Sequence, residues 1–296
     1  MPELPEVEIV KRGLSPVLTG KRIASADVRR PDLRYPFPAD FARRIEGRTV
    51  VDVSRRAKYL LLSLSGRETL IVHLGMSGRL SVVPASAAGT ALTFGEYVYD
   101  TGALPQHDHV VLTLSDGARV VYNDPRRFGF MLLSKTELLW DHPVFERLGV
   151  EPLSGDLTAQ YLAACAVGRR ADLKSFLLDQ RIIAGLGNIY VSEALFRAGL
   201  SPRRAASALA RSGGQPNERA ERLVPQIKAV LEAAIAAGGA SLKDYRHTDG
   251  TAGQFQNAFS VYDREGRECP RPGCGGVVRR IVQAQRSTFY CDRCQR

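Results

Sequence analysis

Four cysteines near the C-terminus have the spacing of metal ligands. Cys269, Cys274, Cys291 and Cys294 are separated by four, sixteen and two residues. Four thiolates on two short knuckles form a closed tetrahedral zinc site, which is structural because no position is left for water. The bound ion would supply the folding free energy that so short a segment lacks. Such a finger occurs equally in enzymes, in nucleic-acid-binding modules and in RNA polymerase subunits.

The N-terminal segment PELPE is the second candidate for chemistry. If Met1 is removed, Pro2 carries a secondary α-amine, and an α-amine titrates much nearer to neutrality than a lysine. Attack of this amine on a sugar C1′ would give an iminium Schiff base, and Glu3 beside it could move protons. A simpler explanation remains open, in which Pro2 and Pro5 only initiate a helix.

Composition indicates a phosphate partner and argues against a membrane protein. The chain has 41 Lys and Arg against 31 Asp and Glu, a net charge of +10. Half of this excess lies in residues 264–296, where a dense arginine patch favours phosphates through counterion release. The alternative is a solvated basic tail. The apolar runs are too short to span a bilayer, and the acidic, proline-rich start is unlike a secretory signal. We therefore expect a cytosolic protein.

Strand patterns dominate the first half of the chain. A helix is expected over residues 5–14, ended or kinked by Ser15-Pro16. The β-rich runs, which glycines punctuate, are residues 49–53, 59–64, 69–74, 110–114, 119–122 and 129–133. A β-sandwich is the natural closure of that many strands. Residues 84–106 interrupt the pattern and are expected to form a long surface loop.

Helical patterns take over in the second half. The expected helices are residues 161–167, 173–178, 190–198 and 219–237. Residues 238–254 are glycine-rich and are expected to be mobile. In the cysteine region, residues 277–282 and 288–290 should form a hairpin with 285–287 at its tip. The prediction is an α+β protein with a catalytic β-sandwich domain (1–150), a helical domain (151–261) and a zinc finger (262–296).

Six segments, read together, resemble the formamidopyrimidine-DNA glycosylase family over nearly the whole chain. They are PELPEVE (2–8), RAKYL (56–60), HLGMSG (73–78), NDPRRFG (123–129), GLGNIY (185–190) and QAQRSTFY (283–290) within the four-cysteine tail. The resemblance implies a β-sandwich with a leading helix, a helix–two-turns–helix domain and a zinc finger, with DNA in the cleft between them. It also implies a monomeric enzyme that acts on double-stranded DNA containing oxidised purines or abasic sites.

The resemblance also implies catalytic roles. Pro2 would be the nucleophile and Glu3 the acid/base that helps to open the sugar ring. Glu6 would orient this machinery or the flipped nucleotide. Lys58 would bind the phosphate next to the lesion, although by pattern alone it is an ordinary strand lysine.

DNA contacts are implied for His107, Lys174, Asn188, Lys243 and Arg286. Asn188 lies in a glycine-rich turn that opens a helix, where backbone N–H groups can bind a phosphate; the turn also reads simply as a helix connection. Met76, Arg126 and Phe128 would fill the space left by a flipped base, although without the motif core packing would be the expectation for Met76 and Phe128.

Three features depart from the family pattern. The first cysteine pair has four intervening residues instead of two, residues 84–106 are longer than usual, and Gln106 stands where a lysine is expected. A sister enzyme of the endonuclease VIII type would commonly read Pro-Glu-Gly-Pro-Glu, whereas this chain has Leu4. A damage-binding protein without activity is disfavoured by Pro2, Glu3 and Lys58. A zinc-ribbon transcription factor would leave the first 260 residues unexplained.

Overall fold

The computed structural model describes residues 2–85, 104–240 and 254–296. The chain divides into two compact units, Met1–Glu146 with Ala237–Gln254 and Arg147–Ala236 with Phe255–Arg296. Across the described residues, no helix has both the length and the apolar composition that crossing a bilayer demands.

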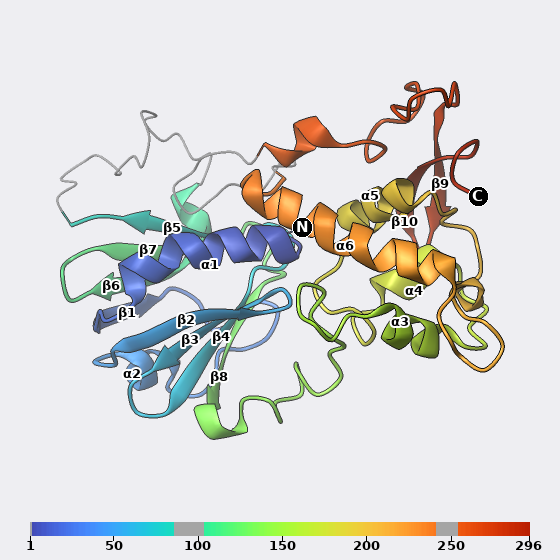
Figure 1. Ribbon diagram of the computed structural model, residues 1–296. Helices are drawn as coiled ribbons and strands as arrows, with labels where there is room; N and C mark the ends of the chain where they lie inside the picture. Colours follow the sequence, from blue (N-terminus) through green and yellow to red (C-terminus); the bar gives the residue numbers. More distant parts are fainter. Residues whose placement is uncertain (1, 86–103, 241–253) are drawn as a thin grey trace. The chain divides into compact units, whose positions relative to one another are not determined.

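The leading helix, α1, extends from Leu4 to Leu18 and contacts β2, β3 and β5 of the first unit (Figure 1). Its apolar face recurs at helical spacing and is fully buried at Val7, Leu14 and Leu18. The expected end of the helix at Ser15-Pro16 is wrong, because the helix continues through Pro16 to Leu18. Pro16 is exposed, and the burial of Leu18 outweighs the backbone hydrogen bond that the proline cannot donate.

Within the described residues, eight strands of the first unit form two four-stranded antiparallel sheets. One sheet has the order β1-β6-β7-β5, with bounds Ile23–Val28, Asp108–Leu114, Arg119–Asn123 and Arg79–Val83. The other has the order β2-β3-β4-β8, with bounds Val50–Arg56, Tyr59–Leu64, Glu68–His73 and Phe130–Lys135. A short helix, α2 (Phe41–Ile45), packs beside β1.

Apolar residues from both sheets and from α1 form one continuous core, which confirms the β-sandwich with its leading helix. The six expected strands are all present, and β1 and β5 add two more. β1 escaped prediction because its pairing with β6 is irregular between Ile23 and Ser25, which breaks the alternation of buried and exposed residues. Most of the expected loop 84–106 lies outside the described residues, and Pro105–His107 forms a 3-10 turn, η1.

The second unit is helical, and its helix α5 is almost entirely buried. The α-helices among its described residues are α3 (Ala159–Ala166), α4 (Leu173–Leu178), α5 (Asn188–Ala198) and α6 (Glu218–Ala236). α5 contacts α4, α6 and strand β10. Nine of its eleven residues are buried, so a helix that the sequence predicted as one of four equals is the core of this unit. The connection between α4 and α5 consists of two turns, held by the Gln180 amide through Leu186 O (2.8 Å) and Gly185 N (2.9 Å).

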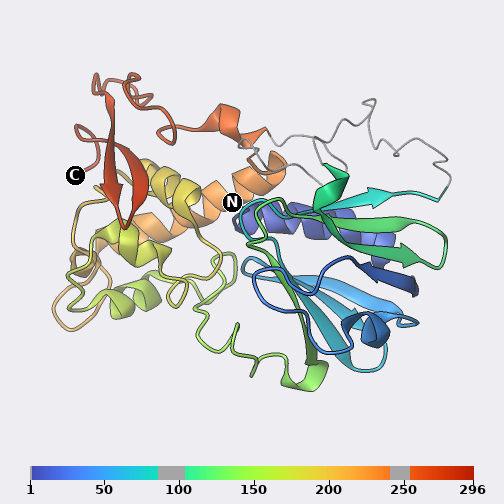
Figure 2. The ribbon, with the colours of Figure 1, turned by 180° about the vertical axis from the view of Figure 1, so that it is seen from behind.

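The C-terminal hairpin consists of β9 (Val278–Gln283) and β10 (Arg286–Cys291), seen at the upper left of Figure 2. Gln283 pairs with Arg286, so the two-residue tip is Ala284-Gln285 and the expected tip at 285–287 is wrong. Both tip residues are left-handed, with φ of 47° and 59°. Such a turn matches the right-handed twist of the two strands, which explains why the hairpin tolerates it.

Buried Glu193 of α5 fixes the chain just before the finger. Its carboxylate accepts hydrogen bonds from the backbone N–H groups of Ser260, Val261 and Tyr262, each at 2.9 Å. Three donors compensate the burial of this charge.

Candidate active site and zinc centre

The N-terminal residues of the first unit are held by a buried carboxylate. Pro2 is buried and Glu3 is 3% exposed. The backbone N–H of Glu3 donates to Glu6 Oε2 at 2.8 Å, and the N–H of Ala240 donates to Glu6 Oε1 at 2.9 Å. Each oxygen of Glu6 therefore accepts a hydrogen bond from the backbone, and one of the two donors is the residue next to Pro2. Of the two roles expected for Glu6, this geometry supports the orientation of the N-terminus.

Lys58 lies in the tight connection between β2 and β3, where Arg56 pairs with Tyr59. It is 9% exposed. Arg55 fixes this turn to α1, because its guanidinium donates to Ala57 O at 2.9 Å and to Glu8 Oε2 at 3.0 Å. The helix that follows Pro2 and the turn that carries Lys58 are thus joined by one arginine.

The Glu8–Arg55 ion pair is largely shielded from solvent, with side chains 13% and 10% exposed. Burial alone would raise the pKa of Glu8, but hydrogen bonds from Arg55 and Arg12 outweigh it and hold that pKa below its usual range. Glu8 is consequently a charged anchor at neutral pH.

His73 was missed as a single candidate, although it begins the HLGMSG segment. Its ring stacks on Phe130 with centroids 5.0 Å apart, and its Nδ1 accepts from the N–H of Gly75 at 3.1 Å. Burial, followed by the charges of Lys58 and Arg34, lowers the pKa of His73 to about 4. The ring is neutral at physiological pH, and since Nδ1 is an acceptor, its proton is on Nε2.

The three residues expected to replace a flipped base come from two neighbouring loops. Met76 is half-buried after β4, and Arg126 and Phe128 precede β8. Phe128 is 44% exposed, and the Arg126 guanidinium lies 5.1 Å from the centre of its ring. This exposure excludes core packing for Phe128, and the stacked guanidinium gives the pair a shared flat surface.

Asn188 and Lys174 of the second unit converge on the finger hairpin. Asn188 Nδ2 donates to Ser287 O at 3.1 Å. Lys174 Nζ donates to the same oxygen at 2.9 Å and to Thr288 Oγ1 at 2.6 Å. Both side chains hold the residues that directly follow exposed Arg286.

The expected contact of Lys174 with a DNA phosphate stays a prediction. In the structure this lysine is fully buried, and its ammonium donates to two oxygens of the hairpin. Its role in this geometry is to fix the finger. His107 is half-buried in η1 beside Gln106. Lys243 and Met1 lie outside the described residues.

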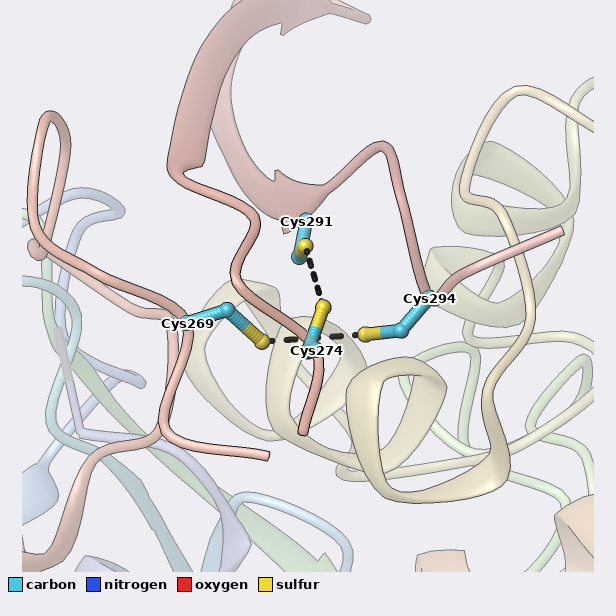
Figure 3. A group of neighbouring side chains, drawn as sticks. All are labelled: Cys269, Cys274, Cys291 and Cys294. Carbon is cyan, nitrogen blue, oxygen red and sulfur yellow. Dashed lines mark hydrogen bonds between the residues drawn. The ribbon is translucent and has the colours of Figure 1, made fainter. Parts of the chain in front are cut away.

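The four cysteines of the tail meet at one point (Figure 3). Their sulfur atoms all lie within 4.8 Å of one another, with Cys269 3.7 Å from Cys294 and Cys274 3.6 Å from Cys291. Zinc–sulfur bonds of about 2.3 Å in a tetrahedron place sulfur atoms about 3.8 Å apart. The donor set and its size therefore fit one zinc ion.

The widened first knuckle closes without disturbing the cluster. The N–H of Cys269 donates to Gly276 O at 2.8 Å, and the N–H of Cys274 donates to Arg271 O at 3.0 Å. A Cβ on Gly276 would lie 2.7 Å from the sulfur of Cys291, so glycine is required where the chain passes the metal ligands.

Comparisons with known proteins agree with this architecture along the entire chain. Residues 1–131 match the formamidopyrimidine-DNA glycosylase N-terminal domain, 148–246 the H2TH domain of the same enzymes, and 266–296 the zinc finger found in FPG and IleRS. A formamidopyrimidine-DNA glycosylase of Azorhizobium caulinodans is 58% identical over the full length of both chains. The chain belongs to the formamidopyrimidine-DNA glycosylase family.

Solved structures of the glycosylase family superpose on the chain. The MutM (Fpg) protein of Thermus thermophilus is 38% identical, with a TM-score of 0.82 over 99% of this chain and 98% of that one. Fpg of Lactococcus lactis, solved with DNA containing an abasic site, is 29% identical with a TM-score of 0.83 over 99% of both chains. The expected glycosylase fold of β-sandwich, H2TH domain and four-cysteine finger is confirmed, and so is the single structural zinc ion.

Proposed function

We propose that this chain removes 8-oxoguanine and formamidopyrimidines from duplex DNA, and that Pro2 is the nucleophile of both its glycosylase and its AP lyase reactions. The observation that carries the role of Pro2 is the buried N-terminus, in which Glu6 accepts a hydrogen bond from the residue next to Pro2. A nucleophile needs such fixed orientation, because attack requires the reacting atoms in near contact.

The reaction follows from an amine at that position. The nitrogen of Pro2 attacks C1′ as the bond from C1′ to the damaged base breaks, and the base leaves with a proton. Opening of the sugar ring at O4′, with Glu3 as the proton carrier, gives the iminium. Loss of a C2′ proton then breaks the C3′–O bond, and a second elimination breaks the C5′–O bond. Hydrolysis frees Pro2 and leaves a one-nucleotide gap with a phosphate on each side.

The remaining site residues act on the DNA. Lys58 and the Nε2–H of His73 supply a charge and a donor for the phosphate next to the lesion. Met76, Arg126 and Phe128 replace the flipped nucleotide in the stack. Asn188, at the start of α5, and Arg286 bind backbone phosphates, with His107 and Lys243 as further contacts. The three-domain division at residues 150 and 261, a monomeric state and a cytoplasmic location at the nucleoid belong to the same proposal.

Borohydride trapping on a duplex with one 8-oxoguanine opposite cytosine tests this function. Reduction of the iminium should yield a covalent protein–DNA band, which Pro2→Gly should abolish or greatly weaken. Pro16→Ala is the matched control, because Pro16 is an exposed proline near the other end of α1, and its replacement should leave the band unchanged.

Other outcomes would replace the proposal. Trapping only on an oxidised pyrimidine would indicate the specificity of the endonuclease VIII type. Tight binding without any trapped band would leave a damage-recognition protein without lyase activity.

A further inference from the structure

A fully buried carboxylate, Asp124, begins the loop that carries Arg126 and Phe128 and faces the loop that carries Met76. The hydroxyl of Ser77 donates to Asp124 Oδ1 at 2.6 Å. The N–H of Gly129 donates to Oδ2 at 2.9 Å, and the hydroxyl of Tyr122 donates to the same oxygen at 3.2 Å. Burial and the adjacent Asp124 carboxylate raise the pKa of Tyr122 well above its usual value, which keeps this phenol a donor.

Two of these donors are chain neighbours of residues expected to enter the duplex. Ser77 follows Met76, and Gly129 follows Phe128. The Ser77 oxygen in turn accepts from the N–H of Arg126 at 3.2 Å. One carboxylate is thus connected, through at most one further group, to the positions of all three residues.

Direct backbone contact joins the same two loops. A Cβ added to Gly75 would lie 2.3 Å from the nitrogen of Gly129 and from the carbonyl carbon of Phe128. The backbone of Asp124 is itself fixed to β6, because Asp124 O lies 2.9 Å from His109 Nε2. Neither loop can shift without disturbing the other or leaving a buried charge without its donors.

We propose that Asp124 is a positioning residue that couples the two loops, so that Met76, Arg126 and Phe128 enter the duplex as one preassembled wedge. This inference rests on the proposed function of those three residues. Preassembly matters because three side chains ordered separately would each lose conformational entropy when the base is flipped. In the proposed function the Arg126 guanidinium meets the edge of the cytosine left without its partner. Base expulsion and recognition of that cytosine then become a single event, because Arg126 is held with the other two residues.

Two variants break the coupling at different points. Asp124→Asn retains the shape but places an amide N–H₂ against a donor, and Ser77→Ala removes the link from Asp124 to Arg126 while leaving the carboxylate in place. Asp116→Asn is the matched control, because Asp116 is an exposed carboxylate in the turn between β6 and β7 that also accepts a backbone N–H, at 3.1 Å. Thermal unfolding should show that all three variants remain folded.

The measurements separate base expulsion from amine chemistry. Single-turnover excision of 8-oxoguanine from duplex should fall about tenfold to a hundredfold in Asp124→Asn and Ser77→Ala. The ratio of rates with cytosine and with adenine opposite the lesion should fall by at least about threefold, because Arg126 is no longer fixed. Trapping at a preformed abasic site in single-stranded DNA should change by less than about threefold, since no base has to be expelled there. Asp116→Asn should resemble the wild type in all three.

Clear outcomes would overturn the inference. If both variants keep the wild-type rate and the wild-type opposite-base ratio, or if trapping on single-stranded DNA falls as far as excision from duplex, Asp124 does not act through the wedge. Failure of the proposed function looks different, because Met76→Ala, Arg126→Ala and Phe128→Ala would then excise 8-oxoguanine as fast as the wild type.

Discussion

Two acidic residues at the start of α1, Glu3 and Glu6, form a reciprocal capping box in which each side chain accepts the backbone N–H of the other, yet only Glu3 is proposed to carry protons. Glu6 uses one oxygen for the N–H of Glu3 and the other for the N–H of Ala240. Neither oxygen can be replaced by a donor without losing a hydrogen bond inside the protein. At the scale of single residues, the chain next to Pro2 is therefore positioned by carboxylates that bind backbone N–H groups.

Replacement of Glu6 by glutamine tests this division of labour. The amide keeps the volume but turns an N–H₂ donor toward one of the two backbone N–H groups, so that one hydrogen bond is lost. We expect the rate of trapping at an abasic duplex to fall about tenfold or more, because the nucleophile is less well oriented. DNA affinity, measured by fluorescence anisotropy, should stay within about threefold. A loss of affinity that matches the loss of rate would contradict an orienting role.

His73 should make folding stability depend on pH. Its pKa of about 4 in the folded chain is below the ordinary value of 6.5, so the unfolded chain binds a proton that the folded one does not. The contribution is complete at pH 7 and is lost as pH falls from about 6.5 towards 4. Between pH 7 and pH 5 the wild type should lose about 2 kcal/mol more of unfolding free energy than His73→Gln. Urea unfolding at the two pH values measures this, and equal losses would rule it out.

At the scale of elements, the turn of the finger hairpin has a backbone conformation that is unfavourable for its two residues, while Lys174 and Asn188 hold the strand that follows it. Ala284 and Gln285 are both left-handed, and each costs about 1 kcal/mol relative to glycine. Gln285→Gly should therefore stabilise the finger by up to about 1 kcal/mol. The measurement is the temperature at which zinc is released to a chromogenic chelator. Val282→Gly, in an exposed position of β9, is the control and should lower that temperature.

The elements with strong local patterns were predictable and the network between them was not. The bounds of β3 and α4 agree with the prediction because alternation and helical spacing are regular there. The tip of the hairpin was misplaced because Ala-Gln has no turn signature. Hydrogen bonds such as the one from Ser77 to Asp124 join residues 47 apart in sequence, and no local pattern encodes them. The same holds for Lys174, whose type suggested a phosphate and whose burial assigns it to the finger.

At the scale of the whole molecule, several arginines of the basic patch that indicated DNA interact with other residues of the protein. Arg279 forms an ion pair with Asp292, Arg280 lies 3.8 Å from Glu265, and Arg271 lies over the Phe196 ring. Exposed Arg286 remains as the arginine that the resemblance assigns to phosphate.

A salt titration distinguishes these arginines. Arg286→Ala should make the slope of log affinity against log salt concentration less negative by about 1, because one phosphate contact is lost. Arg279→Ala should leave the slope unchanged, since its guanidinium is already paired. Affinity that did not depend on salt in the wild type would contradict phosphate binding by the finger.

Zinc should be required for DNA binding. We expect one zinc per chain in the wild type, and loss of both zinc and DNA affinity in Cys274→Ser. Cys165→Ser is the matched control, because Cys165 is half-buried in α3 and outside the cluster, and should retain both. Metal analysis together with anisotropy provides the test. After chelation, Zn2+ should restore binding and Mg2+ should not, because thiolates are poor ligands for magnesium.

The buried ammonium of Lys174 also limits which zinc fingers could replace this one during evolution. Fingers of this type are shared with IleRS, which suggests a portable module. Here, however, Lys174 requires a hydroxyl at position 288 and a carbonyl turned inward at 287. A finger grafted from another protein without them would strand a positive charge in the helical unit at a cost of several kcal/mol. The lysine and the hairpin are therefore expected to be replaced together or not at all, and chimeric proteins should be joined upstream of both.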